Sequence, residues 1–279
     1  MIKRSTFFTF VTLALLMISS RAMGAVVDSI ESPKLWLAEQ SEIGQSLLQQ
    51  TQEFNRAVTV LKAAHEFALA QDLAEQFIEI SIAYGIALYK NGEIQKAHTI
   101  LLEVLPKIAD TDLEKKAEAN QILGMTLVFQ DKFPQGYKYQ MDALKYYSDM
   151  GDSTGLMSVY YDLGANFGTQ GQSELALDNY EKGIAIAKSL QDAKMTILGT
   201  TAIGGTWASL NDFDKALTYI VESYELAKVL NDDEELAWAS INRGHVLAQI
   251  EKYQESAFYL RKAYDLSFKI GNRLLTAYA

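Results

Sequence analysis

The stretch of this sequence that comes nearest to a chemical motif is a run of small residues between Gly199 and Thr206. It approaches a phosphate-binding loop, in which backbone N–H groups surround the phosphates and a lysine reaches the terminal ones. Gly205 stands in the lysine's place, and no strand-like run precedes the stretch. We therefore interpret these residues as part of a helix and predict no nucleotide cofactor.

The other residues capable of chemistry are scattered. His65, His98 and His245 lie far apart, without the spacing of a metal site, and there is no cysteine to supply a thiolate or a disulfide. The acidic run at 232–235 is typical of a helix start, because carboxylates favour the positive end of the helix dipole, and it lacks the ligand spacing of a calcium loop. No serine stands in a nucleophile motif. We predict no catalytic residue, no metal site and no cofactor.

What does organise the sequence is a forty-residue repeat. Gly124, Gly164, Gly204 and Gly244 are forty residues apart, and Gly85 precedes them by thirty-nine. Twelve residues after each glycine stands another small residue, which lets two helix backbones approach closely. These small residues are Ala97, Gly136, Ala176, Ala216 and Ser256. An acidic or amide residue closes each repeat and is suited to cap the next helix. These closing residues are Asp72, Asp112, Asp152, Asp192, Asp232 and Asn272.

Each repeat predicts two helices joined by a turn. Apolar residues recur at helical spacing, and Gly92, Gly171 or the pair Asn211 and Asp212 supply the turns. Pro106 is expected to bend or shorten its helix, since proline lacks the backbone donor. We expect helices at about 34–51, 54–71, 74–90, 94–109, 114–130, 134–149, 154–170, 174–190, 194–210, 214–230, 234–250 and 254–270, with another starting at Arg273.

The repeat columns carry a resemblance to a known family. Leu123-Gly124, Phe133, Gly136 and Ala143, repeated as Leu163-Gly164 with Ala176 and as Ile203-Gly204 with Phe213 and Ala216, are similar to the tetratricopeptide signature. The resemblance implies an all-α fold, a right-handed α-solenoid of antiparallel helix pairs. We assign a degenerate unit at 34–72, clear units at 73–112, 113–152, 153–192, 193–232 and 233–272, and a truncated unit at 273–279. The usual tetratricopeptide unit has thirty-four residues, so the forty-residue spacing resembles a long variant found in bacterial sensor and regulator proteins.

The resemblance also implies a binding groove, because the first helix of each tetratricopeptide pair lines the concave face. The positions expected to form the binding site are Gln121, Met125, Tyr161, Thr201, Trp238, Ile241 and His245, and Glu79, Ile82 and Ile86 are expected on the same face. The Lys/Asn/Arg clamp with which chaperone-binding members hold a peptide carboxylate is missing there. Aromatic residues among small ones suit an amphipathic helix or an apolar small molecule. The alternative, that Tyr161 and Trp238 pack between helices, stays open.

The N-terminal segment has the three parts of a secretory signal peptide. A basic start is followed by the uncharged stretch 7–18 and by small residues up to Gly24. We predict a signal peptide at 1–24 and a linker at 25–33; an uncleaved anchor is the alternative. Removing 1–24 takes away Lys3, Arg4 and Arg21 but no acid, so that 22 basic residues oppose 35 acidic ones and the net charge becomes −13. Such a charge repels phosphate backbones, and nucleic acid is not an expected partner.

Together these features predict an exported, periplasmic protein-binding module and not an enzyme. Signal peptide and repeat length resemble the periplasmic input regions of bacterial diguanylate cyclases and histidine kinases. The sequence stops within the first helix of the truncated unit at Ala279. This favours a longer protein with a downstream membrane segment and an output domain, although the stub could instead be a short cap. The alternative function is a free periplasmic scaffold for an envelope assembly, and a hydrolase using a groove carboxylate has no support beyond the abundance of acids.

Overall fold

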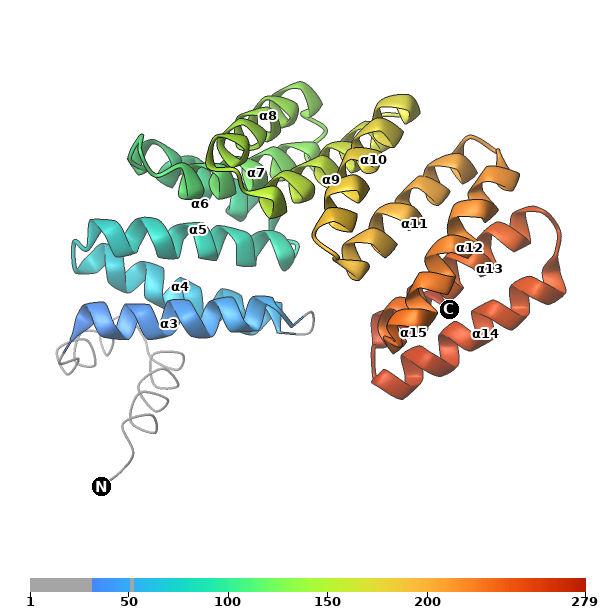
Figure 1. The fold of residues 1–279 in the computed structure, drawn as a ribbon. Helices are drawn as coiled ribbons and strands as arrows, with labels where there is room; N and C mark the ends of the chain where they lie inside the picture. Colours follow the sequence, from blue (N-terminus) through green and yellow to red (C-terminus); the bar gives the residue numbers. More distant parts are fainter. Residues whose placement is uncertain (1–31, 51–52) are drawn as a thin grey trace. The chain divides into compact units, whose positions relative to one another are not determined.

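The computed structural model describes residues 32–50 and 53–279, and in these ranges every regular element is a helix. The chain divides into two compact units, of which the first ends at Met150 and the second begins at Gly151 (Figure 1). The helices of the first unit are α3 (Pro33–Leu48), α4 (Phe54–Ala70), α5 (Ala74–Lys90), α6 (Ile94–Val104), the 3-10 turn η1 (Leu105–Lys107), α7 (Leu113–Val128) and α8 (Phe133–Met150).

The second unit consists of seven α-helices. They are α9 (Ser153–Thr169), α10 (Ser173–Ser189), α11 (Ala193–Ser209), α12 (Phe213–Leu230), α13 (Asp233–Gln249), α14 (Tyr253–Ile270) and the short α15 (Arg273–Tyr278). The bounds lie close to those expected from the sequence. Pro106 shortens α6 as predicted: the helix ends at Val104 after 11 residues, and Pro106 lies in η1.

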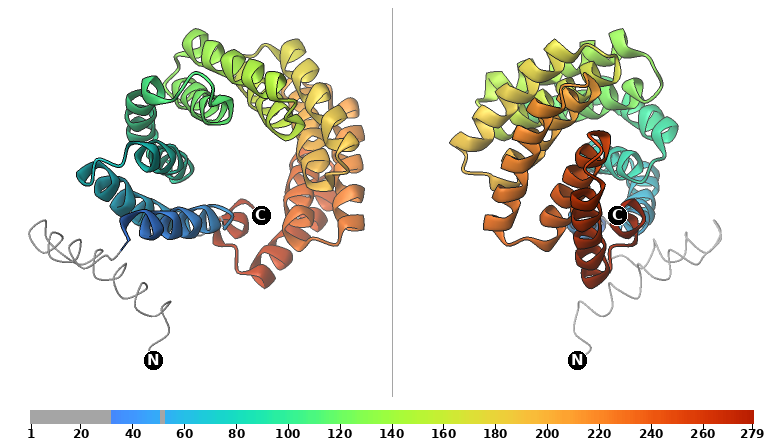
Figure 2. Two further views of the ribbon diagram at one scale, coloured as in Figure 1. Left: turned by 60° about the vertical axis from the view of Figure 1, so that its left-hand side comes forward. Right: turned by 90° about the vertical axis from the view of Figure 1, so that its right-hand side faces the viewer.

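Within each unit, consecutive helices run in opposite directions and pack side by side (Figures 1 and 2). The first helices of successive pairs also touch each other, α3 with α5 and α5 with α7 in the first unit, and α11 with α13 in the second. Buried apolar residues fill the space both within and between the pairs, and one cluster of the first unit has members on every helix from α3 to α7. In the first unit the indole ring of Trp36 meets the ring of Phe67 edge-on, with 4.8 Å between the ring centres. This arrangement is an α-solenoid of helix pairs, which confirms the predicted all-α fold class.

The helix starts follow the predicted capping. The Asp152 carboxylate accepts hydrogen bonds from the backbone N–H groups of Thr154 and Gly155, each at 3.0 Å, and Asp192 accepts one from Met195 at 3.0 Å. These bonds satisfy donors that have no partner within the helix. Asp72 is the exception. It adopts a left-handed backbone conformation with φ of 54°, and Leu73 takes the cap position of α5 without a side-chain bond.

The small-residue columns lie where two helices come close, as predicted. A Cβ atom added to Gly124 on α7 would lie 2.9 Å from the carbonyl oxygen of Gly136 on α8, and one added to Gly136 would lie 2.8 Å from the carbonyl oxygen of Gly124. Backbone atoms cannot move aside as a flexible side chain can. The contact between α7 and α8 therefore requires glycine on both sides.

Two predictions concern the N-terminal segment. The predicted signal peptide at 1–24, and the linker at 25–33 as far as residue 31, lie outside the described residues. The boundaries of the repeat units likewise stay a prediction. Among the helices that are described, none is long and apolar enough to cross a membrane.

Candidate functional site

A cavity of about 510 Å³ lies in the first unit between the first helices of its pairs, and we call it the α3–α5–α7 cavity. Its lining comes from α3 and the residue after it (Gln45, Leu48, Gln49), from α5 (Glu79, Ile82, Ala83, Ile86, Lys90) and from α7 (Glu114, Lys115, Glu118). Glu79, Ile82 and Ile86, which were expected on the binding face, thus line a cavity between first helices.

The α3–α5–α7 cavity combines apolar residues with charged ones. Leu48, Ile82 and Ala83 form the buried apolar floor of the cavity, and the half-buried Ile86 is the apolar side chain most accessible to a partner. The charged residues are three glutamates and two lysines. A concave apolar surface with a few polar groups is the usual composition of a binding site, since the apolar part supplies affinity and the polar part orientation.

The Glu118 carboxylate of this cavity is poorly neutralised. Burial raises the pKa of Glu118, and the charge of Glu114 raises it further, whereas Lys115 offsets part of the shift. Lys115 is held by Asp112, with 2.6 Å between the ammonium nitrogen and a carboxylate oxygen. A cation brought into the cavity would favour the ionised form of Glu118.

The second lysine of the cavity, Lys90, has a structural role. Its ammonium donates to the carbonyl oxygen of Leu48 at 3.4 Å, at the C-terminal end of α3, and lies 5.8 Å from the centre of the Phe54 ring. Cations are stabilising at helix C-termini. Burial lowers the pKa of Lys90. This lysine therefore ties α5 to α3. Glu79 accepts a hydrogen bond from the Ser41 hydroxyl at 3.1 Å, which leaves Glu114 and Glu118 as the carboxylates most available to a partner.

Two of the seven predicted site residues lie in the first unit, on α7. Gln121 accepts a hydrogen bond from the Tyr147 hydroxyl at 3.2 Å, and the Met125 sulfur accepts one from the Gln140 amide at 3.3 Å. Both partners belong to α8. Gln121 and Met125 are half-buried, and neither lines the α3–α5–α7 cavity.

Tyr161 packs between helices of the second unit. It is 7% exposed, its hydroxyl donates to the Met195 carbonyl oxygen at 2.8 Å, and its ring lies 6.4 Å from that of Tyr180. Burial, with a smaller effect of the Asp192 charge, raises the pKa of the Tyr161 hydroxyl to about 12. Of the two roles left open by the sequence, the packing role is the one that these contacts support.

The remaining predicted positions differ in accessibility. Ile241 is 2% exposed and belongs to a buried cluster on which Trp238 packs, with the Trp238 ring 5.8 Å from that of Tyr278. Thr201 is half-buried and His245 is exposed. Binding at these residues stays a prediction, with His245 and part of Trp238 offering accessible surface.

Sequence reasoning missed the α7 residues of the cavity, Glu114, Lys115 and Glu118. Glu118 and Glu114 precede Gln121 by three and seven residues, so they share its helix face. This helical spacing from a predicted site residue is the sequence feature that could have identified them. The α3 residues had no such signal, because the first repeat is too degenerate to set their register.

The motifs set aside in the sequence have structural explanations. Gly199 to Thr206 lies inside α11, and a Cβ atom on Gly204 would fall 2.8 Å from the Ile220 side chain. The acidic run opens α13, where Asp232 caps the helix and pairs with Lys194 at 2.6 Å. No group of three or more potential metal-ligating side chains occurs in the part of the chain that the structure covers.

Comparison with known proteins agrees with this geometry. A family model described as tetratricopeptide repeat matches residues 239–270, which comprise most of α13 and all of α14. The tetratricopeptide repeat family is thereby supported. No curated protein sequence matches the chain.

Solved structures share the tetratricopeptide-like fold at low sequence identity. BtubC from P. vanneervenii is 16% identical, with a TM-score of 0.59 over 81% of this chain and 92% of that one. A Rap protein complexed with competence and sporulation factor is 14% identical, with a TM-score of 0.62 over 87% of this chain and 68% of that one. NprR in complex with its cognate peptide NprX is 14% identical, with a TM-score of 0.63 over 94% and 79%. At such identities the likeness concerns the fold alone.

Proposed function

We propose that this tetratricopeptide-like chain is a protein-interaction module whose α3–α5–α7 cavity holds a peptide with an apolar side chain next to a basic one. The apolar side chain would contact Ile82 and Ile86, and the basic one would approach Glu118. The observation that carries the proposal is the position of the poorly neutralised Glu118 beside apolar residues in a cavity lined by the first helices.

Two further facts support a peptide ligand with positive charge. The solved neighbours include a Rap protein complexed with competence and sporulation factor and NprR in complex with its cognate peptide NprX. The protein carries a net charge of −10, so its field attracts cationic segments. An amphipathic helix with a basic edge meets both requirements.

Peptide selection tests the proposal without knowledge of the natural partner. Random peptides displayed on phage would be selected on the whole protein, and we expect enrichment of sequences with lysine or arginine beside large apolar residues. Glu118→Gln and Ile86→Ala should each weaken the selected peptides at least about tenfold, equivalent to about 1.4 kcal/mol. The matched control is Glu222→Gln, an exposed position on α12. Enriched peptides without basic residues, or equal effects of all variants, would refute the proposal.

We also propose that the module is exported and forms the periplasmic input region of a longer signalling protein, with a free envelope scaffold as the alternative. The charge and hydropathy pattern of residues 1–24 and the forty-residue spacing support this assignment. Fusing β-lactamase after Ala279 tests export, because only an exported fusion gives ampicillin resistance in a Gram-negative host. Deleting residues 1–24 should abolish that resistance. The gene sequence beyond Ala279 then separates the two roles: a membrane helix with an output domain supports the input region, and an early stop codon supports the scaffold.

A further inference from the structure

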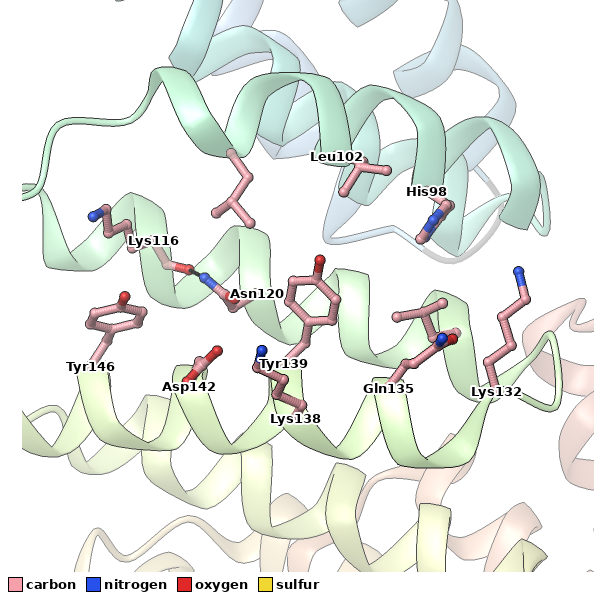
Figure 3. A pocket seen from close by; sticks show the side chains of 12 residues that line it. His98, Leu102, Lys116, Asn120, Lys132, Gln135, Lys138, Tyr139, Asp142 and Tyr146 are labelled. Atoms are coloured by element: carbon pink, nitrogen blue, oxygen red, sulfur yellow. Dashed lines mark hydrogen bonds between the residues drawn. The ribbon is translucent and has the colours of Figure 1, made fainter.

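The first unit contains a second cavity, of about 550 Å³, on the side formed by the second helices of its pairs. We call it the α6–α8 cavity (Figure 3). Its lining residues are His98 and Leu102 of α6, Leu105 of η1, Lys116, Asn120 and Leu127 of α7, Lys132 just before α8, and Gln135, Lys138, Tyr139, Asp142 and Tyr146 of α8.

The shortened α6 explains why this space is open. Helix α6 has 11 residues and ends before Pro106, whereas α8 has 18. Beyond Leu105 no residue of α6 or η1 lines the cavity, although the α8 residues Asp142 and Tyr146 continue it. The proline thus produces a cavity that a full-length helix would narrow.

The charge of this lining is opposite to that of the protein. Three lysines face one carboxylate, that of Asp142, in a chain whose net charge is −10. Lys116 is paired with Asp110, and Lys132 donates to the Gln130 side chain at 2.9 Å. Among the described residues, no carboxylate oxygen lies within 4.0 Å of the Lys138 ammonium nitrogen. The cavity therefore contains cationic groups that are free to receive an anion.

Lys132 and His98 come from opposite sides of the cavity (Figure 3). The Nδ1 atom of His98 lies 3.1 Å from the Thr126 hydroxyl oxygen, and that hydroxyl donates to the Leu123 carbonyl at 2.8 Å. Nδ1 is therefore the protonated nitrogen that donates to Thr126. Burial lowers the pKa of His98, and the Lys132 charge lowers it further. An anion beside Lys132 would relieve this repulsion.

The α6–α8 cavity also has apolar lining residues that could contact the apolar part of a ligand. Figure 3 shows the ring of Tyr139 projecting from α8 toward α6 in the middle of the cavity. Leu102 and Leu105 line the α6 side and Leu127 the α7 side. A volume in the range of about 300–1,000 Å³ suits a small organic molecule.

We propose that the α6–α8 cavity binds a small organic anion, with its phosphate or carboxylate held by the amine of Lys132 and attracted by the more distant amine of Lys138, and its planar apolar body against Tyr139 and Leu102. Such a ligand would bind on the opposite helix layer of the unit from the α3–α5–α7 cavity. The inference does not depend on the peptide-binding proposal.

Calorimetric titration of the whole protein with four probes tests the ligand chemistry. We expect phenyl phosphate or benzoate to bind with one-to-one stoichiometry and a dissociation constant of about 1 mM or tighter. Whichever of the two binds better identifies the anionic group. Inorganic phosphate should bind at least about tenfold more weakly and phenol should give no binding, because each lacks one half of the ligand. Equal binding of inorganic phosphate, or no binding of either aromatic anion at this level, overturns the proposal.

Variants then locate the site. The double variant Lys132→Gln/Lys138→Gln should weaken the bound probe at least about tenfold. The control Lys62→Gln/Lys145→Gln makes the same charge change at exposed positions outside the cavity and should leave affinity unchanged. Leu102→Trp, which keeps every charge and fills the apolar end, should also abolish binding. Circular dichroism melting of each variant verifies folding.

Two further observations separate this site from the peptide site. The imidazole NMR signals of His98 should move on addition of the probe, and those of His245, which lies on α13 in the second unit, should not. Glu118→Gln should leave the probe affinity unchanged. Shifts at His245 alone, or loss of binding in the charge control, would show a general attraction of anions and refute the site.

Discussion

The guanidinium of Arg243 lies over the ring of Tyr259, with 4.2 Å between the guanidinium carbon and the ring centre. The same guanidinium carbon lies 5.0 Å from the centre of the Tyr224 ring, and the rings of Tyr224 and Tyr259 meet edge-on. The three residues come from α13, α14 and α12, so one cation joins three helices of the second unit. No carboxylate lies within ion-pair distance of Arg243 in the described residues, and the aromatic faces take that place.

A double-mutant cycle measures this contact. The cycle combines Arg243→Met with Tyr259→Leu, and we expect a coupling energy of about 0.5–2 kcal/mol from chemical denaturation. Arg261→Met with Tyr259→Leu is the comparison, since Arg261 is exposed on α14. Additive losses in the Arg243 cycle would show that packing alone joins the helices.

Two adjacent glycines of α11 should respond to alanine in opposite directions. A Cβ atom on Gly204 would lie 2.8 Å from the Ile220 side chain and 3.3 Å from the Ala216 carbonyl oxygen, whereas one on Gly205 meets nothing within 4 Å. Gly204→Ala should therefore destabilise the protein by about 1–3 kcal/mol. Gly205→Ala should stabilise it by about 0.5–1 kcal/mol, because alanine favours the helix. Denaturant titration of both variants checks the sign, and equal signs would contradict the close helix contact.

Tyr161 should act on stability. Tyr161→Ala removes a buried ring, and we expect a loss of about 3–5 kcal/mol in the free energy of unfolding. Tyr161→Phe removes the hydrogen bond to the Met195 carbonyl alone and should cost about 1 kcal/mol. Thermal melting and urea titration measure both. A near-neutral Tyr161→Ala would return the residue to the predicted binding surface.

The half-buried histidines His65 and His98 should make stability depend on pH. The His65 ring lies 5.0 Å from the Phe77 ring and 5.5 Å from the Tyr84 ring, and its Nδ1 is 2.9 Å from the Ser81 hydroxyl. Burial lowers its pKa, and the charges of Glu103 and Glu66 offset only part of that shift.

The unfolded chain therefore binds the proton first. Because the folded pKa of His65 is depressed, its contribution is fully present above the ordinary histidine value of about 6.5 and is lost as the pH falls toward the folded value. We expect the free energy of unfolding to decline in that window, and His65→Gln should flatten the decline. His65→Gln/His98→Gln should flatten it more, since burial also lowers the pKa of His98. If the free energy of unfolding of both variants declines with falling pH as steeply as that of the unmodified protein, the two imidazoles are not shielded from water.

Helix positions and helix ends could be predicted because their causes are local. Apolar periodicity, a capping carboxylate such as Asp152 and a helix breaker such as Pro106 act within a few residues along the chain. The glycine columns also revealed the close helix contacts, since only a missing side chain permits the backbone approach at Gly124 and Gly136.

The residues that line the two cavities could be identified only from the tertiary structure. The sequence by itself determined an all-helical chain of repeating pairs with an acidic surface, because those properties follow from local spacing and composition. It did not determine that Tyr161 is buried, that Glu118 faces the α3–α5–α7 cavity in place of Gln121, or that lysines gather beside a shortened α6. Residues three apart on one helix point in directions that differ by about 60°. Which of them reaches a cavity depends on how each helix is rotated against its neighbours, and that rotation is set by the packing of all the pairs together.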